Sequence, residues 1–162
     1  LAASTESARR GVEPLQPTVW AELSKGQRFE LVPVSPEDLR HWTGQGTWRG
    51  DERLPVNFFE HLKVKAGADA VLFCELTHYR AYPPLQIGWR FRLVDTERQL
   101  TWWSVDELFD AGREEVQNSA RRYYLRKFRS TGPLADSQSI FQTPGRFAEY
   151  SLETLAATLP GR

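Results

Sequence analysis

The sequence predicts an α/β fold in which a single mixed β-sheet carries helices packed on it. Three successive strand patterns with short joins, over about residues 70–108, predict an antiparallel meander in the middle of the chain. Helical patterns precede and follow this meander, so we expect helices from both parts of the chain to cover the sheet, in an arrangement like that of the anticodon-binding domain.

The segment 85–94 is the clearest of the three strands. Apolar residues alternate there with polar or small ones, as expected for a strand with one buried side and one side in water. The apolar side consists of Leu85, Ile87, Trp89, Phe91 and Leu93, and the other side consists of Gln86, Gly88, Arg90 and Arg92. The face that carries Arg90 and Arg92 is therefore either open to water or covered by a partner.

The segments around the meander predict the remaining elements. Before it we expect a short helix from Pro17 to Gly26, a strand over 28–34, and helices that begin near Pro36 and Pro55 and end near Gly44 and Gly67. Because helices join the strand over 28–34 to the strand over 70–79, the two should be parallel neighbours with a right-handed crossover. After the meander we expect a helix over 113–129, a loop over 130–142 and a last helix from Pro144 to Pro160.

Length and composition indicate an ordinary globular domain. We interpret residues 1–16 as a poorly ordered or partly helical lead-in and residues 17–162 as a single α/β domain. Lys plus Arg and Asp plus Glu are equal at 21 each, so no net charge points to nucleic acid or an anionic membrane. The chain starts at Leu1 and contains no methionine, so we expect further residues upstream, where a signal sequence or a lipid anchor could stand.

The residues that most often carry chemistry are scattered. Cys74 lies in an apolar run and is interpreted as a core cysteine, and a single cysteine cannot form an internal disulfide. The histidines His41, His61 and His78 lack the spacing of metal ligands. An acidic cluster is interpreted as a solvated strand end that leads into a helix; it consists of Asp106, Glu107, Asp110, Glu114 and Glu115. We therefore predict no catalytic, cofactor-binding or metal-binding residues, no cofactor, and no enzymatic activity.

Two segments are candidates for contact with a partner. The glycine-rich loop 44–50 lacks the features of a phosphate-binding loop, and its Trp48 and the adjacent Arg49 are candidate contact residues. The segment 121–129, with Arg122 and Arg126, interleaves basic and aromatic residues. A solvated helix end is the simpler interpretation of this segment, and binding of nucleic acid or anionic lipid is the alternative.

Motifs in the meander resemble those of bacterial envelope lipoproteins. The run Gly67-Ala68-Asp69-Ala70-Val71-Leu72 is followed by Leu93-Val94-Asp95 and then by Leu100-Thr101-Trp102-Trp103-Ser104-Val105-Asp106-Glu107. This pattern is similar to that of curli-assembly (CsgG-type) lipoproteins, of outer-membrane lipoprotein activators of penicillin-binding proteins, and of the amino-terminal domain of the Tol-system translocation protein. Two features depart from it: the turn 96–99 has no glycine, and the usual first strand has no clear equivalent.

The resemblance implies a function without transferring any functional residue, because the matching positions are structural. It implies a non-enzymatic domain of the periplasm, of a kind that can be anchored to the outer membrane, that acts through contacts with a protein partner in the cell envelope. Membrane association is expected only through a lipid anchor outside this chain, and no nucleic acid is expected as a partner. The candidate contact residues are Trp48, Arg49, Arg90, Arg92, Arg122 and Arg126.

Overall fold

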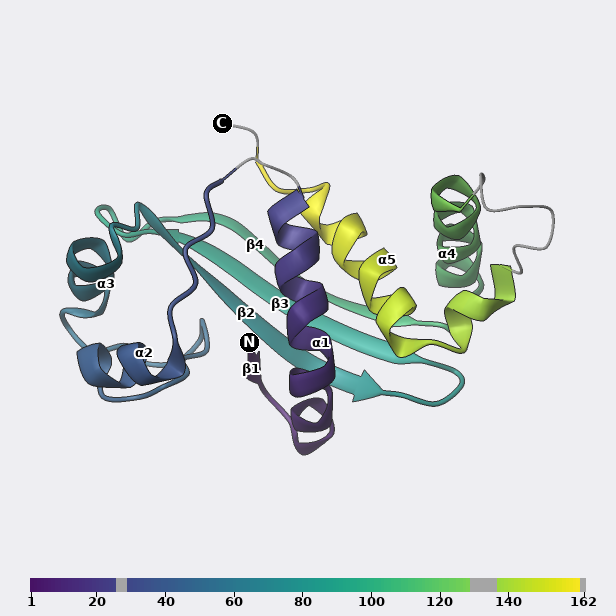
Figure 1. Ribbon diagram of the computed structural model, residues 1–162, viewed down its shortest axis with the longest axis horizontal. Helices are drawn as coiled ribbons and strands as arrows, with labels where there is room; N and C mark the ends of the chain where they lie inside the picture. Colours follow the sequence, from purple (N-terminus) through teal and green to yellow (C-terminus); the bar gives the residue numbers. More distant parts are fainter. Residues whose placement is uncertain (26–28, 129–136, 161–162) are drawn as a thin grey trace.

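The computed structural model describes residues 1–25, 29–128 and 137–160. These residues form a single four-stranded mixed sheet with helices packed around it, which confirms the predicted α/β fold (Figure 1). The strands, in their order across the sheet, are β1 (Ala2–Ala3), β2 (Ala70–Arg80), β3 (Gln86–Asp95) and β4 (Thr101–Asp110). The helices are α1 (Glu6–Lys25), α2 (Pro36–Thr43), α3 (Phe58–Ala66), α4 (Glu114–Lys127) and α5 (Pro144–Ala156), with a 3-10 helix, η1 (Ser137–Phe141), before α5.

Strands β2, β3 and β4 form the antiparallel meander that the alternating pattern predicts. The apolar side of β3 is at the centre of the core, where Ile87, Trp89 and Phe91 are at most 1% exposed. The indole nitrogen of Trp89 donates a hydrogen bond of 2.8 Å to Ser151 Oγ on α5. The one polar atom of this large side chain is thereby satisfied inside the core.

The parallel neighbour of β2 is a different segment from the one that the sequence predicts. The described part of the predicted strand, residues 29–34, contains no strand, and Val32 is 54% exposed. Instead, Ala2 and Ala3 pair in parallel with Glu75 and Leu76. Alternation indicates an extended chain but does not show that a sheet edge is in reach, and Pro33 lacks the N–H that a ladder needs.

Helix α1 begins at Glu6, eleven residues before the start that Pro17 suggests, and it contains both Pro14 and Pro17. Residues 1–16 are therefore largely strand β1 and the first part of α1. The helix is stabilised by its buried stripe of Ala8, Gly11, Leu15, Val19 and Glu22. Packing against the sheet is close at Gly11, where a β-carbon would lie 2.6 Å from Tyr79 Cγ. Tertiary burial thus outweighs the unfavourable local propensity of two prolines and a glycine.

The helices lie on both faces of the sheet. Helices α1 and α5 lie side by side across one face and cover the main core, with α4 beyond α5 at one end (Figure 1). On the opposite face, Phe73 and Val94 pack against Phe58 and Leu62 of α3 in a smaller second cluster. Because this cluster covers only one end of β2 and β3, the rest of the second face is free for polar side chains.

The local boundaries agree with the sequence pattern at α2 and differ at α3. Ser35 caps α2 by accepting the N–H of Asp38, as its position predicts. Helix α3 begins at Phe58 and not at Pro55. It ends before Gly67, as predicted, and the φ of 64° at Gly67 is the left-handed conformation that glycine readily adopts.

Candidate functional site

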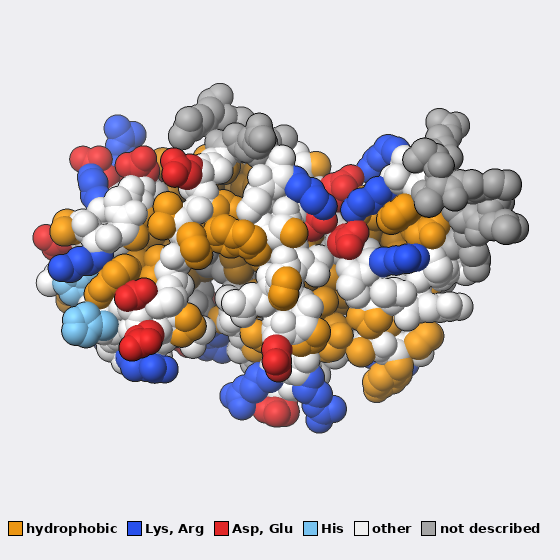
Figure 2. All heavy atoms as spheres, viewed as in Figure 1, with side chains coloured by type: hydrophobic (Ala, Val, Ile, Leu, Met, Phe, Trp, Pro, Cys, Tyr) orange, Lys and Arg blue, Asp and Glu red, His pale blue; other side chains and the backbone are white. Residues whose placement is uncertain are grey.

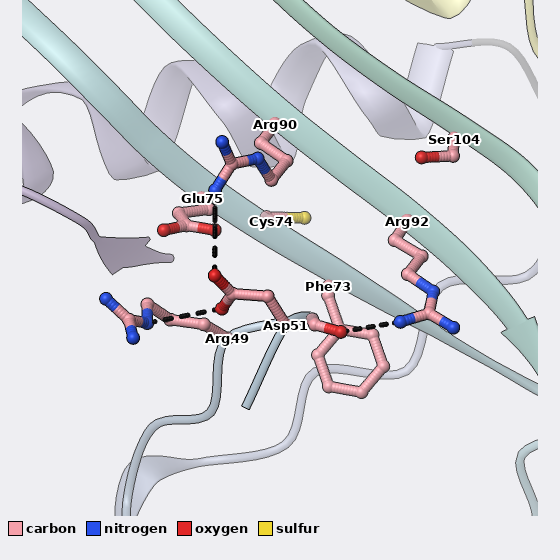
Figure 3. Close-up of a pocket in the computed structure, with 9 residues that line it drawn as sticks. Arg49, Asp51, Phe73, Cys74, Glu75, Arg90, Arg92 and Ser104 are labelled. Carbon is pink, nitrogen blue, oxygen red and sulfur yellow. Dashed lines mark hydrogen bonds and ion pairs between the residues drawn. The ribbon is translucent and has the colours of Figure 1, made fainter. Parts of the chain in front are cut away.

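The open face of the sheet, opposite α1 and α5, brings together several of the predicted contact residues. The register aligns Phe73, Arg92 and Ser104 in one row across β2, β3 and β4. The next row consists of Glu75, Arg90 and Asp106. Both rows are possible because one side of β3 points away from the helices, so the alternation that buries Trp89 also places the two arginines together. Figure 3 shows the first row, and Glu75 and Arg90 of the second, with the loop over 49–51 lying against them.

Arg90 is the centre of an ion-pair network. Its guanidinium lies 2.6 Å from Asp106 Oδ2, 3.5 Å from Glu75 Oε2 and 3.9 Å from Asp51 Oδ2. The hydrogen bond to Asp106 is the main cause that raises the pKa of Arg90 above its usual value. Arg90 thus connects β3, on which it lies, to β2, to β4 and to the loop over 49–51. Three carboxylates share its positive charge.

Glu75 is the buried member of the network, with only 2% of its surface exposed. One of its oxygens accepts a hydrogen bond from Ser4 Oγ, at the junction of β1 and α1, and the other has only the ion pair with Arg90. A carboxylate that is buried in this way is costly without a cation beside it. Arg90 therefore stabilises the contact between the short strand β1 and the sheet.

Arg92 holds the loop against the sheet, and Arg49 forms ion pairs within the loop. Arg92 donates to the carbonyl of Gly50 at 2.6 Å and to Thr101 Oγ1 at 3.0 Å. Arg49 lies 3.4 Å from Asp51 and 3.1 Å from Glu52. Between the loop and the strands remains a cavity of about 120 Å³, small for an organic cofactor. Arg49 and Arg90 are paired with acids at this cavity, and Arg92 bonds to neutral oxygens, so these contacts fix the loop on the sheet.

Trp48 packs inside the domain and holds the loop in place. Its indole nitrogen donates to Thr43 Oγ1 at 2.7 Å, and its ring meets the ring of Phe58 edge to face at 5.8 Å. The side chain packs against the second cluster and is only partly exposed. The loop is thereby anchored at one end by Trp48 and on the sheet by Arg92.

At the basic end of α4, two of the basic side chains are paired with acids of α5. Arg126 lies 2.9 Å from Glu153, and Lys127 lies 2.8 Å from Glu149. Burial lowers the pKa of Lys127, but hydrogen bonds to Glu149 and Tyr123 outweigh it and raise the pKa above its usual value. Figure 2 shows acidic and basic side chains next to each other over α4 and α5.

The candidate Arg122 forms no ion pair with the described residues. Arg122 is exposed on α4. Arg129, the last residue of the basic segment, lies outside the described residues.

The remaining polar candidates do not converge. Burial raises the pKa of the Cys74 thiol to about 12, which favours the unreactive protonated form. His78 Nε2 lies 3.0 Å from Gln86 Oε1, and the Gln86 amide donates to Asp110 at 2.9 Å. This chain of hydrogen bonds crosses the open face near its end. Over the described residues, no three His, Cys, Asp or Glu side chains gather as metal ligands.

The outer edge of β4 is a feature that the sequence analysis did not single out. This ten-residue strand is the last of the sheet, and most of its side chains are exposed. Exposed apolar side chains lie along or just before it, at Leu100 (58%), Trp102 (46%) and Leu108 (44%). In the sequence, the sign of such an edge is that apolar and polar residues alternate only weakly over 100–110. A strand with little burial on either side does not need a strict alternation.

Comparison of the chain with protein family models, with curated proteins and with solved structures gives no match. Among the described helices, none has both the length and the hydropathy that crossing a membrane would require.

Proposed function

We propose that the chain is a non-enzymatic domain that binds a protein partner through β4 and the adjacent open face of the sheet. The observation that carries this proposal is the long outer edge of β4, with Trp102 and Leu108 exposed beside it. Exposed apolar side chains next to an unpaired strand edge are typical of surfaces that associate with other chains.

The arrangement of the charged groups supports a binding role over catalysis. Around Arg90, each acid is used in an ion pair that holds the loop or β1 in place. The thiol of Cys74, with its raised pKa, is a poor nucleophile at neutral pH. The ion pairs around Arg90 therefore serve to hold the surface next to β4 in a fixed conformation.

We also propose, from the resemblance of the meander, that the domain works in the bacterial cell envelope as part of a lipoprotein. The support is the motif over 67–72 and 93–107, which coincides with the start of β2 and with the β3–β4 hairpin. The upstream coding sequence tests this proposal. A signal sequence with a lipid-attachment cysteine, and fatty-acid labelling of the expressed full-length protein, are expected; a leaderless, unlabelled protein would contradict it.

Site-specific photocrosslinking in the producing cell tests the binding role. A photoreactive amino acid at Trp102 or Leu108 should give a discrete crosslinked product with another protein, whereas the same group at Leu125 on α4, also exposed (51%), should not. Equal crosslinking at all three positions, or none at β4, would overturn the proposed surface.

The alternative is a binding module for nucleic acid or anionic lipid at the basic end of α4. Titration of labelled DNA, RNA and acidic vesicles at two salt concentrations separates it from the first proposal, because phosphate binding weakens steeply with salt. Because Arg126 and Lys127 are already paired with acids of α5, a phosphate would have to displace those acids, so we expect no salt-sensitive binding.

A further inference from the structure

We propose that the partner binds by adding an extended strand to the outer edge of β4, and that this strand places a Lys or Arg beside Glu107 and an apolar residue beside Val105. This inference rests on the proposed protein-binding function and specifies its mode and chemistry. It follows from which residues of β4 bond to β3, from the side chains next to the outer edge, and from the charge of the strand.

Among the described residues, no backbone hydrogen bond is made on the outer side of β4 at Ser104, Asp106 or Leu108. The N–H of Ala111 bonds to the carbonyl of Leu85 at 2.8 Å, which fixes the phase of the β3–β4 ladder. In an antiparallel pair, the backbone N–H and C=O groups of one residue bond to the neighbouring strand, and those of the next residue point away from it. The backbone groups of Ser104, Asp106 and Leu108 therefore point away from β3, toward the outer edge. They are the groups that an added strand would bond.

The opposite edge of the sheet offers no such site. Strand β1 contains only Ala2 and Ala3, so it presents too few backbone groups for a stable strand pairing. Strand β4 is ten residues long. Within the described chain, β4 is thus the edge with enough length to add a strand.

The side chains of β4 determine what the added strand must carry. On the helix side of the sheet, Val105 is half-buried and Glu107 is exposed. An added strand would cover Glu107, and burying this carboxylate without a cation would oppose the pairing. On the open side, Asp106 already has Arg90 as its partner at 2.6 Å. The unmet requirement is therefore a positive charge beside Glu107, with an apolar neighbour beside Val105.

A second copy of this chain does not meet that requirement. Strand β4 contains three acids and no basic residue, so pairing two β4 strands would bring six carboxylates to one seam. An antiparallel pairing centred on Val105 would set Glu107 beside Trp103 and leave its charge buried without a partner. The acids of β4 thus act against self-association and select a basic strand.

Two peptide probes test the inference. Each has ten residues that alternate Val and Thr, with two central positions as Lys in one peptide and Glu in the other. They are titrated into the isotope-labelled chain, and amide hydrogen exchange is measured. We expect the Lys peptide to slow exchange at Ser104, Asp106 and Leu108 at least tenfold and the Glu peptide to have no effect. Protection elsewhere, equal effects of both peptides, or no protection by either would overturn the inference.

Variants of β4 test the mode of binding. Ser104→Pro removes an outward N–H without removing a bond to β3, so it should weaken the Lys peptide at least tenfold, whereas Ser104→Ala should not. Circular dichroism checks that the proline variant folds. Glu107→Lys should reverse the preference from the Lys peptide to the Glu peptide, and an unchanged preference would overturn the role of Glu107.

The two proposals fail separately. Crosslinks at Trp102 or Leu108 without any peptide pairing would mean that a partner docks on this surface by another mode, which overturns the strand addition alone. Peptide pairing without crosslinks in the cell would mean that the edge can pair but that β4 is not the partner surface there, which overturns the proposed function.

Discussion

The two faces of the sheet use the same three long strands in opposite ways. On the helix-covered face, Trp89 and Phe91 are stacked at 5.8 Å between ring centroids and are sealed by α1 and α5. On the open face, their neighbours Arg90 and Arg92 bind a loop through ion pairs and hydrogen bonds. The covered face derives its stability from apolar area, whereas the region around Arg90 on the open face depends on a few paired charges, where a lost contact should cost less.

The largest expected effect is at the centre of the covered face. Trp89→Ala removes a side chain that is 0% exposed together with its hydrogen bond to Ser151, and should lower the free energy of unfolding by about 3–5 kcal/mol. The matched variant Trp102→Ala, at the edge of β4, should change it by no more than about 0.5 kcal/mol. Urea unfolding measures both, and similar losses would break the distinction between the two regions.

The next effect is on the open face. Arg90→Ala leaves the buried carboxylate of Glu75 with only the Ser4 hydroxyl, and should lower the free energy of unfolding by about 1.5–3 kcal/mol. The lower end is expected because 37% of the Arg90 side chain is exposed and solvent screens its charge. Arg122→Ala, on the exposed side of α4, is the control and should have almost no effect. If Arg90→Ala lowered the free energy of unfolding as little as Arg122→Ala, the network would not stabilise β1.

A gain in stability is expected at the turn between β3 and β4. Gln99 has a φ of 57°, in the left-handed region that glycine adopts more readily than other residues. Gln99→Gly should raise the free energy of unfolding by about 0.5–1 kcal/mol, because it relieves the steric cost of the left-handed backbone. Gln99→Ala keeps that cost and should give no gain. Equal midpoints in thermal unfolding for the two variants would contradict this account.

The smallest effect is a pH dependence at the same turn. The Asp95 carboxylate accepts hydrogen bonds from the backbone N–H groups of Arg98, the larger cause, and Glu97, which hold its pKa below the usual 3.8. A group whose folded pKa is depressed contributes stability above its unfolded pKa and loses it as the pH falls through the folded pKa. The difference in unfolding free energy between the wild-type chain and Asp95→Asn should therefore be constant from pH 7 to about 5 and change below about pH 4. A difference that stays flat in the acid range would exclude this role.

The covered face was largely predictable from the sequence. The alternation over 85–94 is strong because one side of β3 is fully buried, and a shift by one residue would expose every apolar side chain. The signals for a helix start near Pro36 and a helix end near Gly67 were equally reliable, since capping depends on residues close in the chain. The start of α1 was not predictable, because Pro14 and Pro17 oppose a helix that only its packing on the sheet stabilises.

The sequence by itself determined the meander, the side of β3 that is buried, and the fact that Arg90 and Arg92 share the other side. These features follow from the period of a strand, which is a local property of the chain. Tertiary structure alone decided that Ala2–Ala3 is the parallel strand, that loop residues Gly50 and Asp51 meet the two arginines, and that β4 is left as the open edge. Those outcomes depend on which distant segments reach each other, and no periodicity within one segment records that.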